Sequence, residues 1–199
     1  MYLVGLFAQR FEDLNMGAAA STLQTNFRAN NGVFKCTLKE DEIMKYVSSS
    51  HFTSQEISAL HLHYELVSST KREDGLIDQT EFQLALGFAL GESLYVDRIF
   101  QLIDSNGDGY ISFDEFITSA SILSSKGTIA QKVDFSFNVL DFNQDELIDK
   151  DELRKMMMAN VNENVNITLG MEALEEMIAQ TMKEVDLDQD GFINKEEYT

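Results

Sequence analysis

The sequence predicts an all-α fold of two lobes, each built from a pair of helix–loop–helix units. Three observations lead to this prediction. The 199 residues contain no proline, an acidic loop of twelve residues occurs three times, and apolar residues recur at helical spacing before each loop. A chain of this length can form two small lobes with separate cores. We therefore divide it into an N-terminal extension (1–50), a first lobe (51–124) and a second lobe (128–199).

Composition narrows the choice of partner and compartment. Acidic residues outnumber basic ones by 34 to 15, which gives a net charge of −19. Such a surface repels phosphate backbones and anionic headgroups, so nucleic acid is not expected as a partner. The single cysteine, Cys36, rules out an internal disulfide and favours a reducing compartment. Because the apolar opening MYLVGLFA is too short to span a bilayer, we expect a cytoplasmic protein.

The repeated loop has the ligand spacing of an EF-hand, a calcium-binding helix–loop–helix unit. The regular copies are DSNGDGYISFDE, DFNQDELIDKDE and DLDQDGFINKEE, which begin at residues 104, 141 and 186 and are called loops 2, 3 and 4. Each has side-chain oxygens at positions 1, 3, 5 and 9, isoleucine at position 8 and glutamate at position 12. Calcium takes about six to eight hard oxygen ligands, and alternate positions of a tight loop supply them.

Position 7 contributes its backbone carbonyl, and the glutamate at position 12 closes the shell with both oxygens. The predicted ligands are Asp104, Asn106, Asp108, Tyr110, Ser112 and Glu115 in loop 2; Asp141, Asn143, Asp145, Leu147, Asp149 and Glu152 in loop 3; and Asp186, Asp188, Asp190, Phe192, Asn194 and Glu197 in loop 4. We expect two to three bound Ca2+ ions, with Mg2+ as an alternative occupant at rest.

The N-terminal extension contains a candidate lipidation signal. The run MGAAAST, which begins at Met16, is typical of N-myristoylation on Gly17. This signal requires a free N-terminus, so it operates only if translation starts at Met16. In that case we expect the protein to associate with membranes. Otherwise the three alanines form an ordinary helical or flexible stretch, and no membrane partner is expected.

The first hand has only the second half of the motif. Counting back from Glu81, Gly75 falls at position 6 and Ile77 at position 8, whereas Thr70 and Arg72 replace the acids of positions 1 and 3. EF-hands occur in pairs, so we interpret this segment, loop 1, as the structural mate of loop 2. In the simplest interpretation Ile77 forms a β-bridge to the isoleucine of loop 2, and no metal binds.

Loops 2, 3 and 4 each follow a predicted helix, because apolar residues recur three and four positions apart before all of them. These residues are Val96, Ile99, Phe100 and Ile103 before loop 2, Val133, Phe137 and Leu140 before loop 3, and Ile178, Met182 and Val185 before loop 4. The isoleucines at position 8 are expected to form the short β-bridges that couple the loops in pairs.

The three regular loops are not equal. Loop 4 has four carboxylates and Gly191 at position 6, so it should bind calcium well, and loop 2 is regular with three carboxylates. Loop 3 has Glu146 at position 6, where a left-handed backbone costs a non-glycine residue roughly 1 kcal/mol. Asp149 offsets part of this cost with a further negative oxygen. We expect loop 3 to bind more weakly than an equal loop with glycine. The chain ends two residues after Glu197, so we expect the last hand to be truncated after its loop.

Four runs make the chain resemble a known family. DGLIDQTEFQLAL, LYVDRIFQLID, QKVDFSFNVLD and DELRKMM are similar to the calcineurin B-like calcium sensors, with the calcineurin regulatory subunit and the neuronal calcium sensors as more distant relatives. The resemblance covers residues 52–199. It implies two lobes of paired hands and a continuous hydrophobic groove that holds a helix of a protein kinase. The calcineurin regulatory subunit holds a phosphatase helix in a similar way.

The resemblance also implies a different structure for loop 1. In the family this loop is two residues longer than usual and would run here from Ser68 to Glu81, with backbone carbonyls in place of the missing carboxylates. Ser68, Asp74 and Glu81 are then the candidate metal ligands of loop 1. The family usually lacks the basic pair Lys71–Arg72, which brings positive charge to the site, so the interpretation without metal stays open beside this one.

The residues expected to line the groove are Phe100, Phe116, Met156 and Met157. Thioethers adapt to the shape of a partner helix, which makes methionine typical of such surfaces. Adjacent methionines of the run 156–158 must point in different directions, so at least one of them belongs to the core. We predict a calcium sensor that exposes a hydrophobic groove for a kinase helix. The alternatives are a regulatory subunit of a calcineurin-type phosphatase and a calcium buffer.

No catalytic activity is predicted for the chain. His61 and His63 are two residues apart and diverge on a helix, and the sequence contains no phosphate-binding glycine loop and no nucleophile motif. Calcium already accounts for the clusters of carboxylates. The sequence therefore favours a binding protein over an enzyme.

Overall fold

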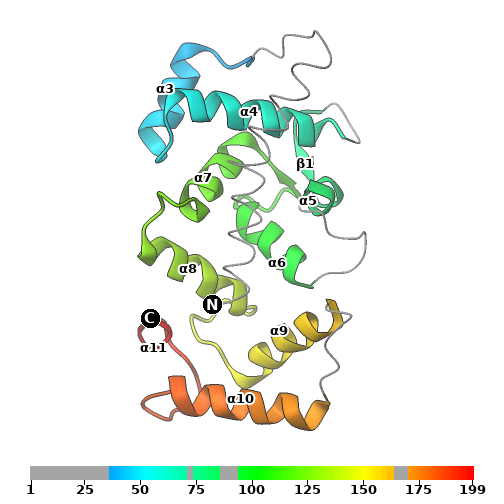
Figure 1. Ribbon diagram of the computed structural model, residues 1–199, viewed down its shortest axis with the longest axis vertical. Coiled ribbons are helices and arrows are strands. Elements are labelled where there is room, and N and C mark those ends of the chain that lie inside the picture. The colour runs from blue at the N-terminus through cyan, green and yellow to red at the C-terminus, as the bar shows by residue number, and fades with distance from the viewer. Residues whose placement is uncertain (1–35, 71–73, 86–93, 164–169) are drawn as a thin grey trace. The chain divides into compact units, whose positions relative to one another are not determined.

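The computed structural model describes residues 36–70, 74–85, 94–163 and 170–199, which form helices joined by short loops (Figure 1). The helices are α3 (Glu40–Ser49), α4 (Ser54–Ser68), α5 (Gln79–Ala85), α6 (Leu94–Ile103), α7 (Phe113–Leu123), α8 (Ile129–Leu140), α9 (Lys150–Glu163), α10 (Met171–Val185) and α11 (Lys195–Tyr198). Strands β1 (Ile77–Asp78) and β2 (Tyr110–Ile111) pair antiparallel. The predicted all-α fold of paired EF-hands is confirmed. None of the helices in these four ranges combines the length and apolarity that a membrane crossing requires.

The described residues fall into two compact units. Unit 1 contains α3, α4, β1, α5, β2 and α7, and unit 2 contains α6 up to residue 102 together with α8 to α11. Helix α6 enters loop 2, yet its contacts group it with unit 2. The lobe boundaries at 51–124 and 128–199 stay a prediction, and Gly17 lies outside the described residues.

Helix α4 carries much of the core of unit 1. It begins with a capping box, in which Thr53 Oγ1 accepts from the Glu56 N–H (3.4 Å) and Glu56 Oε2 accepts from the Thr53 N–H (2.8 Å). Its buried apolar side chains lie about one turn apart, as expected for one face of an amphipathic helix; they are Ile57, Leu60, Tyr64 and Val67. Helix α3 packs against α4 (Figure 1).

The ring of Phe113, the first residue of α7, lies among aromatic side chains of α3 and α4. Its centroid is 5.0 Å from that of Tyr46, 4.7 Å from that of His61 and 5.2 Å from that of Tyr64, all in edge-to-face geometry. The Tyr46 hydroxyl also donates to Asp114 Oδ2 (3.1 Å). These contacts attach α3, which precedes the first hand, to the helix that leaves loop 2.

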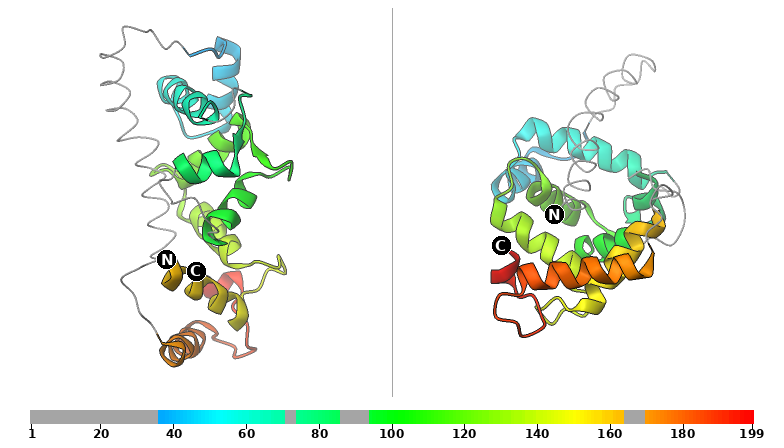
Figure 2. Two further views of the ribbon diagram at one scale, coloured as in Figure 1. Left: turned by 90° about the vertical axis from the view of Figure 1, so that its right-hand side faces the viewer. Right: turned by 60° about the horizontal axis from the view of Figure 1, so that its bottom comes forward.

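Unit 2 has a core of its own. Its buried members are Phe137, Ile148, Leu153, Leu174, Ile178, Met182 and Ile193. Helix α10 lies against α9 (Figure 2), and Arg154 of α9 binds Glu175 of α10 with 2.6 Å between Nε and Oε1. Ile148 and Ile193, at position 8 of loops 3 and 4, exchange two backbone hydrogen bonds of 2.9 Å. The predicted bridge between loops 3 and 4 is confirmed, as is the bridge from Ile77 to the isoleucine of loop 2.

Candidate calcium-binding loops

Position 9 of each regular loop caps the exiting helix, and position 12 is the third residue of that helix. In loop 2, Ser112 Oγ accepts from the Glu115 N–H (3.4 Å) and Glu115 Oε2 accepts from the Ser112 N–H (2.9 Å). The corresponding pairs are Asp149 with Glu152 in loop 3 and Asn194 with Glu197 in loop 4. The last predicted ligand is therefore tied to the start of a helix. We predicted these side chains only as ligands, although the capping signature can be read from the sequence.

The aspartate at position 1 folds each loop back on itself. In loop 2 the carboxylate of Asp104 accepts from the N–H groups of Gly107 (2.9 Å), Asp108 (3.2 Å) and Gly109 (2.9 Å). The aspartates of loops 3 and 4 accept from positions 5 and 6 of their own loops, at 3.0 to 3.2 Å. These bonds turn the carboxylates inward, so the loops are preorganised for a cation.

The glutamates at position 12 of loops 2 and 4 carry a negative charge at neutral pH. Burial alone would raise the pKa of Glu115, but hydrogen bonds from Ser112 and Ser105 outweigh it and lower the pKa. The Ser105 N–H lies 3.0 Å from Glu115 Oε1. Backbone N–H groups, that of Asn194 first, lower the pKa of Glu197. Both carboxylates can therefore receive a divalent cation without first losing a proton.

Positions 4 and 6 have a left-handed backbone in all three regular loops. The φ values are 71° and 84° for Gly107 and Gly109 in loop 2, 61° and 67° for Gln144 and Glu146 in loop 3, and 61° and 93° for Gln189 and Gly191 in loop 4. The predicted left-handed conformation of Glu146 is confirmed, whereas position 4 was not foreseen. Each non-glycine residue in this conformation costs about 1 kcal/mol, so loop 2 has no such cost, loop 4 has one and loop 3 has two.

The loops also differ in exposure. Asp141 and Glu152, the first and last predicted ligands of loop 3, are only 4% and 3% exposed, and Asp104 of loop 2 is 9% exposed. In loop 4, by contrast, the corresponding Asp186 and Glu197 are only half-buried, and carboxylate oxygens of positions 1, 3 and 5 lie within 4.8 Å of one another. Burial strengthens the attraction between a carboxylate and a cation, while close exposed carboxylates repel one another until a cation neutralises them.

Loop 1 is described in its second half. Gly75 has a φ of 73°, and the buried Glu81 exchanges hydrogen bonds with Asp78 (3.0 and 2.8 Å) as its counterparts do in the other loops. The Tyr64 hydroxyl lies 2.9 Å from the carbonyl oxygen of Gly75 and 2.8 Å from that of Ile111. One side chain of α4 therefore joins loop 1 to loop 2, which the sequence did not indicate.

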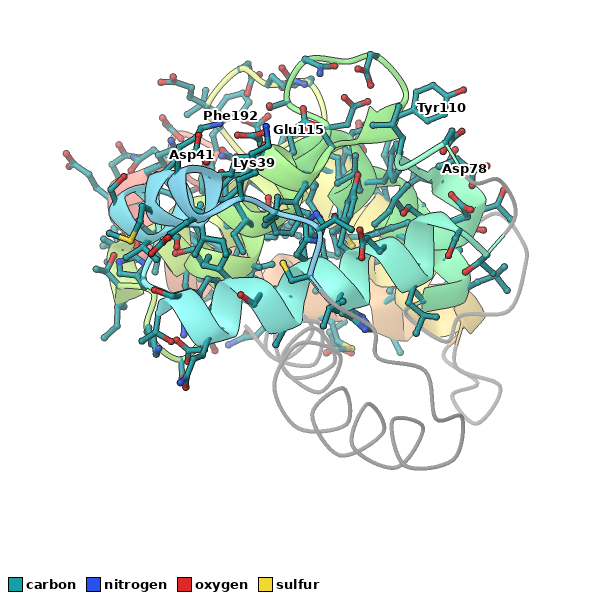
Figure 3. The ribbon with its side chains drawn as sticks, turned by 90° about the horizontal axis from the view of Figure 1, so that it is seen from above. Lys39, Asp41, Asp78, Tyr110, Glu115 and Phe192 are labelled. Carbon is teal, nitrogen blue, oxygen red and sulfur yellow. The ribbon has the colours of Figure 1, made fainter. Side chains whose placement is uncertain are left out.

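In the second half of loop 1, the β1–β2 pairing places Asp78 beside Tyr110 (Figure 3). The first half of the loop is only partly described. Ser68 is buried at the end of α4 and Asp74 is exposed, while Lys71–Arg72 lies outside the described residues. Metal binding in loop 1 stays a prediction, and so does the alternative without metal.

Most of the residues expected to line the groove are buried. Phe100, Phe116 and Met156 are 4% to 7% exposed, and Met157 packs against the core of unit 2. Met158, the third member of the methionine run, is 38% exposed. The groove stays a prediction, and these side chains can reach a partner only after the helices that cover them move.

The donor sets of loops 2, 3 and 4 fit calcium. Each loop offers carboxylate, amide and backbone carbonyl oxygens, loop 2 adds the hydroxyl of Ser112, and no predicted ligand is a softer donor, which is the ligand chemistry that hard cations prefer. The carboxylate at position 1 and the glutamate at position 12 lie at opposite ends of each loop. Hydrogen bonds connect these ends; in loop 3, for example, the Phe142 N–H at position 2 donates to Glu152 Oε1 (2.8 Å). That the ligands predicted from the sequence hold the ion stays a prediction.

Comparisons with known proteins agree with this chemistry. Models of an EF-hand domain pair match residues 73–123 and 131–199. The calcineurin B protein of Schizosaccharomyces pombe is 31% identical over 152 residues, which cover 76% of this chain and 83% of that protein. The calcineurin B protein of Naegleria gruberi is 29% identical over 84% of this chain and 90% of that protein. Calcineurin B-like protein 5 of Arabidopsis thaliana is 27% identical over 80% of this chain and 79% of that protein.

Proposed function

The chain belongs to the calcineurin B-like family of EF-hand proteins and is a calcium-binding regulatory protein, and we propose that calcium opens it to bind a helix of a partner enzyme. When bound, Ca2+ supplies positive charge that neutralises the carboxylates of loops 2, 3 and 4. The rest of the change belongs to the chain itself: a carboxylate moves, the helix that carries it follows, and apolar side chains become accessible.

The observation that carries the proposal is the position of the last ligand in each loop. Glu115, Glu152 and Glu197 are each the third residue of the exiting helix. Because this carboxylate belongs to the start of the helix, its movement toward the first half of the loop would also move the helix. Sensor EF-hands open their helix pairs in response to calcium, whereas buffer EF-hands barely move. The link between ligand and helix gives calcium binding a means to move the helix, which a sensor requires.

The burial of the expected groove residues supports a closed starting state. Phe116 follows Glu115 by one position on α7, and Met156 lies one helical turn beyond Glu152 on α9. Both side chains are buried, at 7% and 4% exposed. Movement of α7 and α9 is therefore a direct way to expose apolar surface to a partner helix.

The partner is a helix of a protein kinase in our proposal, as the resemblance of the sequence implies. A phosphatase helix is the second candidate. It is favoured by the calcineurin B relatives, whose identity to the chain reaches 31%, against 27% for the plant calcineurin B-like protein. In either case the catalysis belongs to the partner. A cytoplasmic location, and membrane association through Gly17, stay predictions.

The test of the sensor is the fluorescence of a hydrophobic dye during a calcium titration. We expect the dye to brighten with calcium in the native chain and to respond much less when Glu115→Gln and Glu152→Gln are combined. The matched control combines Asp114→Asn with Asp151→Asn, which removes the same charges one position earlier on the same helices and should leave the response intact. A native chain that binds calcium without any change in dye signal would identify a buffer.

The partner class is tested by binding to purified catalytic chains. Peptides that span helices of kinases and of calcineurin-type phosphatases are titrated against the native chain with calcium and with a chelator. Calcium-dependent binding of the kinase peptide alone supports the first candidate, and binding of the phosphatase peptide alone supports the second. Binding of neither peptide contradicts the proposal.

A further inference from the structure

A buried arginine of α6 contacts the start of loop 3. Arg98 is only 5% exposed, and its Nε and Nη2 donate to the carbonyl oxygen of Asn138 at 3.2 and 2.9 Å. Nη2 also donates to the backbone carbonyl of Asp141. Asn138 lies in the last turn of α8, and Asp141 is the first predicted ligand of loop 3. The guanidinium thus binds the backbone at the point where the helix becomes the loop.

The chemistry of a helix end explains this contact. The last carbonyls of α8 have no partners within the helix, and they form the negative end of its dipole. A guanidinium offers several donors in one rigid plane and can serve two of these carbonyls together. Burial lowers the pKa of Arg98, while the nearby charges of Asp141 and Glu152 oppose that shift. A guanidinium stays charged in proteins even when it is buried, so Arg98 binds these carbonyls as a cation.

The helix that carries Arg98 also leads into a different calcium loop. Helix α6 ends at Ile103, and the next residue is Asp104, the first predicted ligand of loop 2. Val96 and Ile99 of α6 are fully buried, so the helix moves as a packed element rather than as a loose segment. A change in the direction of α6 when loop 2 binds calcium must therefore act on Arg98, only two turns away.

We propose that Arg98 couples calcium binding in loop 2 to calcium binding in loop 3, an inference that rests on the proposed binding of calcium to both loops. With calcium in loop 2, α6 would keep the position in which Arg98 donates to the carbonyls of Asn138 and Asp141. The first ligand of loop 3 is then fixed in place before the second ion arrives. Arg98 is a positioning residue in this account and does not touch the ion.

If Arg98 acted only through its charge, its substitution would change the calcium affinity of loop 3 in the opposite direction. A positive charge beside loop 3 repels Ca2+, so its removal should tighten binding, and exchange for another cation should change nothing. The positioning role predicts that Arg98→Lys weakens loop 3 although the charge is kept, because an ammonium group cannot reproduce the planar fork. The conservative variant therefore separates the two explanations.

The test needs a signal from loop 3 alone. The chain contains no tryptophan, so Leu147→Trp at position 7 of loop 3 places a unique fluorophore there. In this background Glu115→Gln disables loop 2. We expect it to raise the calcium concentration at the midpoint of the tryptophan signal by about fivefold or more. Arg98→Lys should already weaken calcium binding in loop 3. In that variant, adding Glu115→Gln should shift the midpoint by less than about twofold.

Arg154→Lys is the matched control, because Arg154 lies on α9 of the same hand and binds Asp151 and Glu175 at the surface. It should leave the shift caused by Glu115→Gln unchanged. Two outcomes overturn the coupling. In one, Glu115→Gln does not change the midpoint in the chain with native Arg98. In the other, Glu115→Gln shifts the midpoint equally with Arg98 and with Arg98→Lys. Failure of calcium to change the tryptophan signal in any variant would instead reject calcium binding in loop 3, which is the proposed function itself.

A second measurement leaves Arg98 intact, in case the lysine variant fails to fold. The Nε–H of Arg98 should exchange with solvent more slowly, as measured by NMR, once loop 2 binds calcium. Glu115→Gln should remove that protection. Protection that is the same with and without a functional loop 2 overturns the proposal.

Discussion

Loops 1 and 2 of unit 1 and loops 3 and 4 of unit 2 have similar geometry, but different contacts support the two pairs. In unit 2 both loops have a complete ligand set, and the two isoleucines at position 8 join them through a single bridge. In unit 1 the isoleucines of loops 1 and 2 pair in the same way, but positions 1 and 3 of loop 1 lack the acids, and a side chain from outside the loops, Tyr64, contacts a backbone carbonyl of each loop. The difference shows that an EF-hand can be kept in its pair by contacts with the protein rather than by its own carboxylates.

Loops 2 and 3 provide a second contrast: loop 2 has the less strained backbone, and loop 3 has the greater negative charge. Loop 2 has glycine at both left-handed positions and three carboxylates, and loop 3 has Gln144 and Glu146 there and four carboxylates. Burial of Asp141 and Glu152 adds to the electrostatic side of the balance in loop 3. Calcium affinity therefore rises with the number and burial of the carboxylates and falls with the cost of the left-handed backbone. The following substitutions are chosen to separate these contributions.

The largest effect is expected from Glu152→Gln, which removes a buried charge and the last ligand of loop 3. Loss of a direct ligand should weaken calcium binding by at least about the 100-fold that outer-shell changes can cause. Calorimetric titration should show one fewer tight site. Asp151→Asn, which removes an exposed charge from the same helix, is the control and should change affinity less than about twofold. Equal effects of the two substitutions would show that only net charge matters.

The next effect is expected from Tyr64→Phe, which tests the contact between loops 1 and 2. Removal of the hydroxyl takes away the one O–H that the carbonyls of Gly75 and Ile111 share and should lower the free energy of unfolding by about 1 to 3 kcal/mol. Thermal denaturation followed by circular dichroism measures the change. Tyr110→Phe, at a half-buried position of β2, serves as the control. If the two variants melt together, Tyr64 does not hold the pair.

Glu146→Gly should relieve one unfavourable backbone conformation in loop 3. A gain of about 1 kcal/mol corresponds to roughly fivefold tighter calcium binding. Glu146→Gln is the control, because it removes the same charge and keeps a side chain at the left-handed position. Calcium titration heats that do not change in the glycine variant would contradict this account of loop 3.

The smallest effect is expected from Gly107→Gln, which introduces into loop 2 the residue found at position 4 of loops 3 and 4. A Cβ at Gly107 would meet no atom within 4 Å, so only the φ of 71° opposes the substitution. The cost should be at most about 1 kcal/mol, or no more than roughly fivefold weaker calcium binding. Gly107→Ala gives a comparison with a smaller side chain. An effect as large as that of Glu152→Gln would mean that the conformation at position 4 dominates affinity.

The sequence predicted the parts of the site that depend on local spacing. Carboxylates such as Asp104 and Glu115 stand at fixed distances along one loop, and the apolar residues before them recur with the helical period, so hydrogen bonding within a few residues determines their arrangement. Pairing through Ile77 and Ile148 followed from the same repeat. The capping role of position 9 could also have been read from the spacing of Ser112 and Glu115.

Contacts between segments far apart in the chain could be learned only from the folded protein. The position of the Tyr64 hydroxyl between loops 1 and 2, the burial of Glu152 and the contact of Arg98 with the start of loop 3 depend on how helices pack, and no local pattern marks them. The order of residues was enough to predict which atoms bind calcium, because ligand chemistry is local. Packing determined how tightly those atoms are held and what moves with them, because burial and helix-end contacts are set by neighbours distant in sequence.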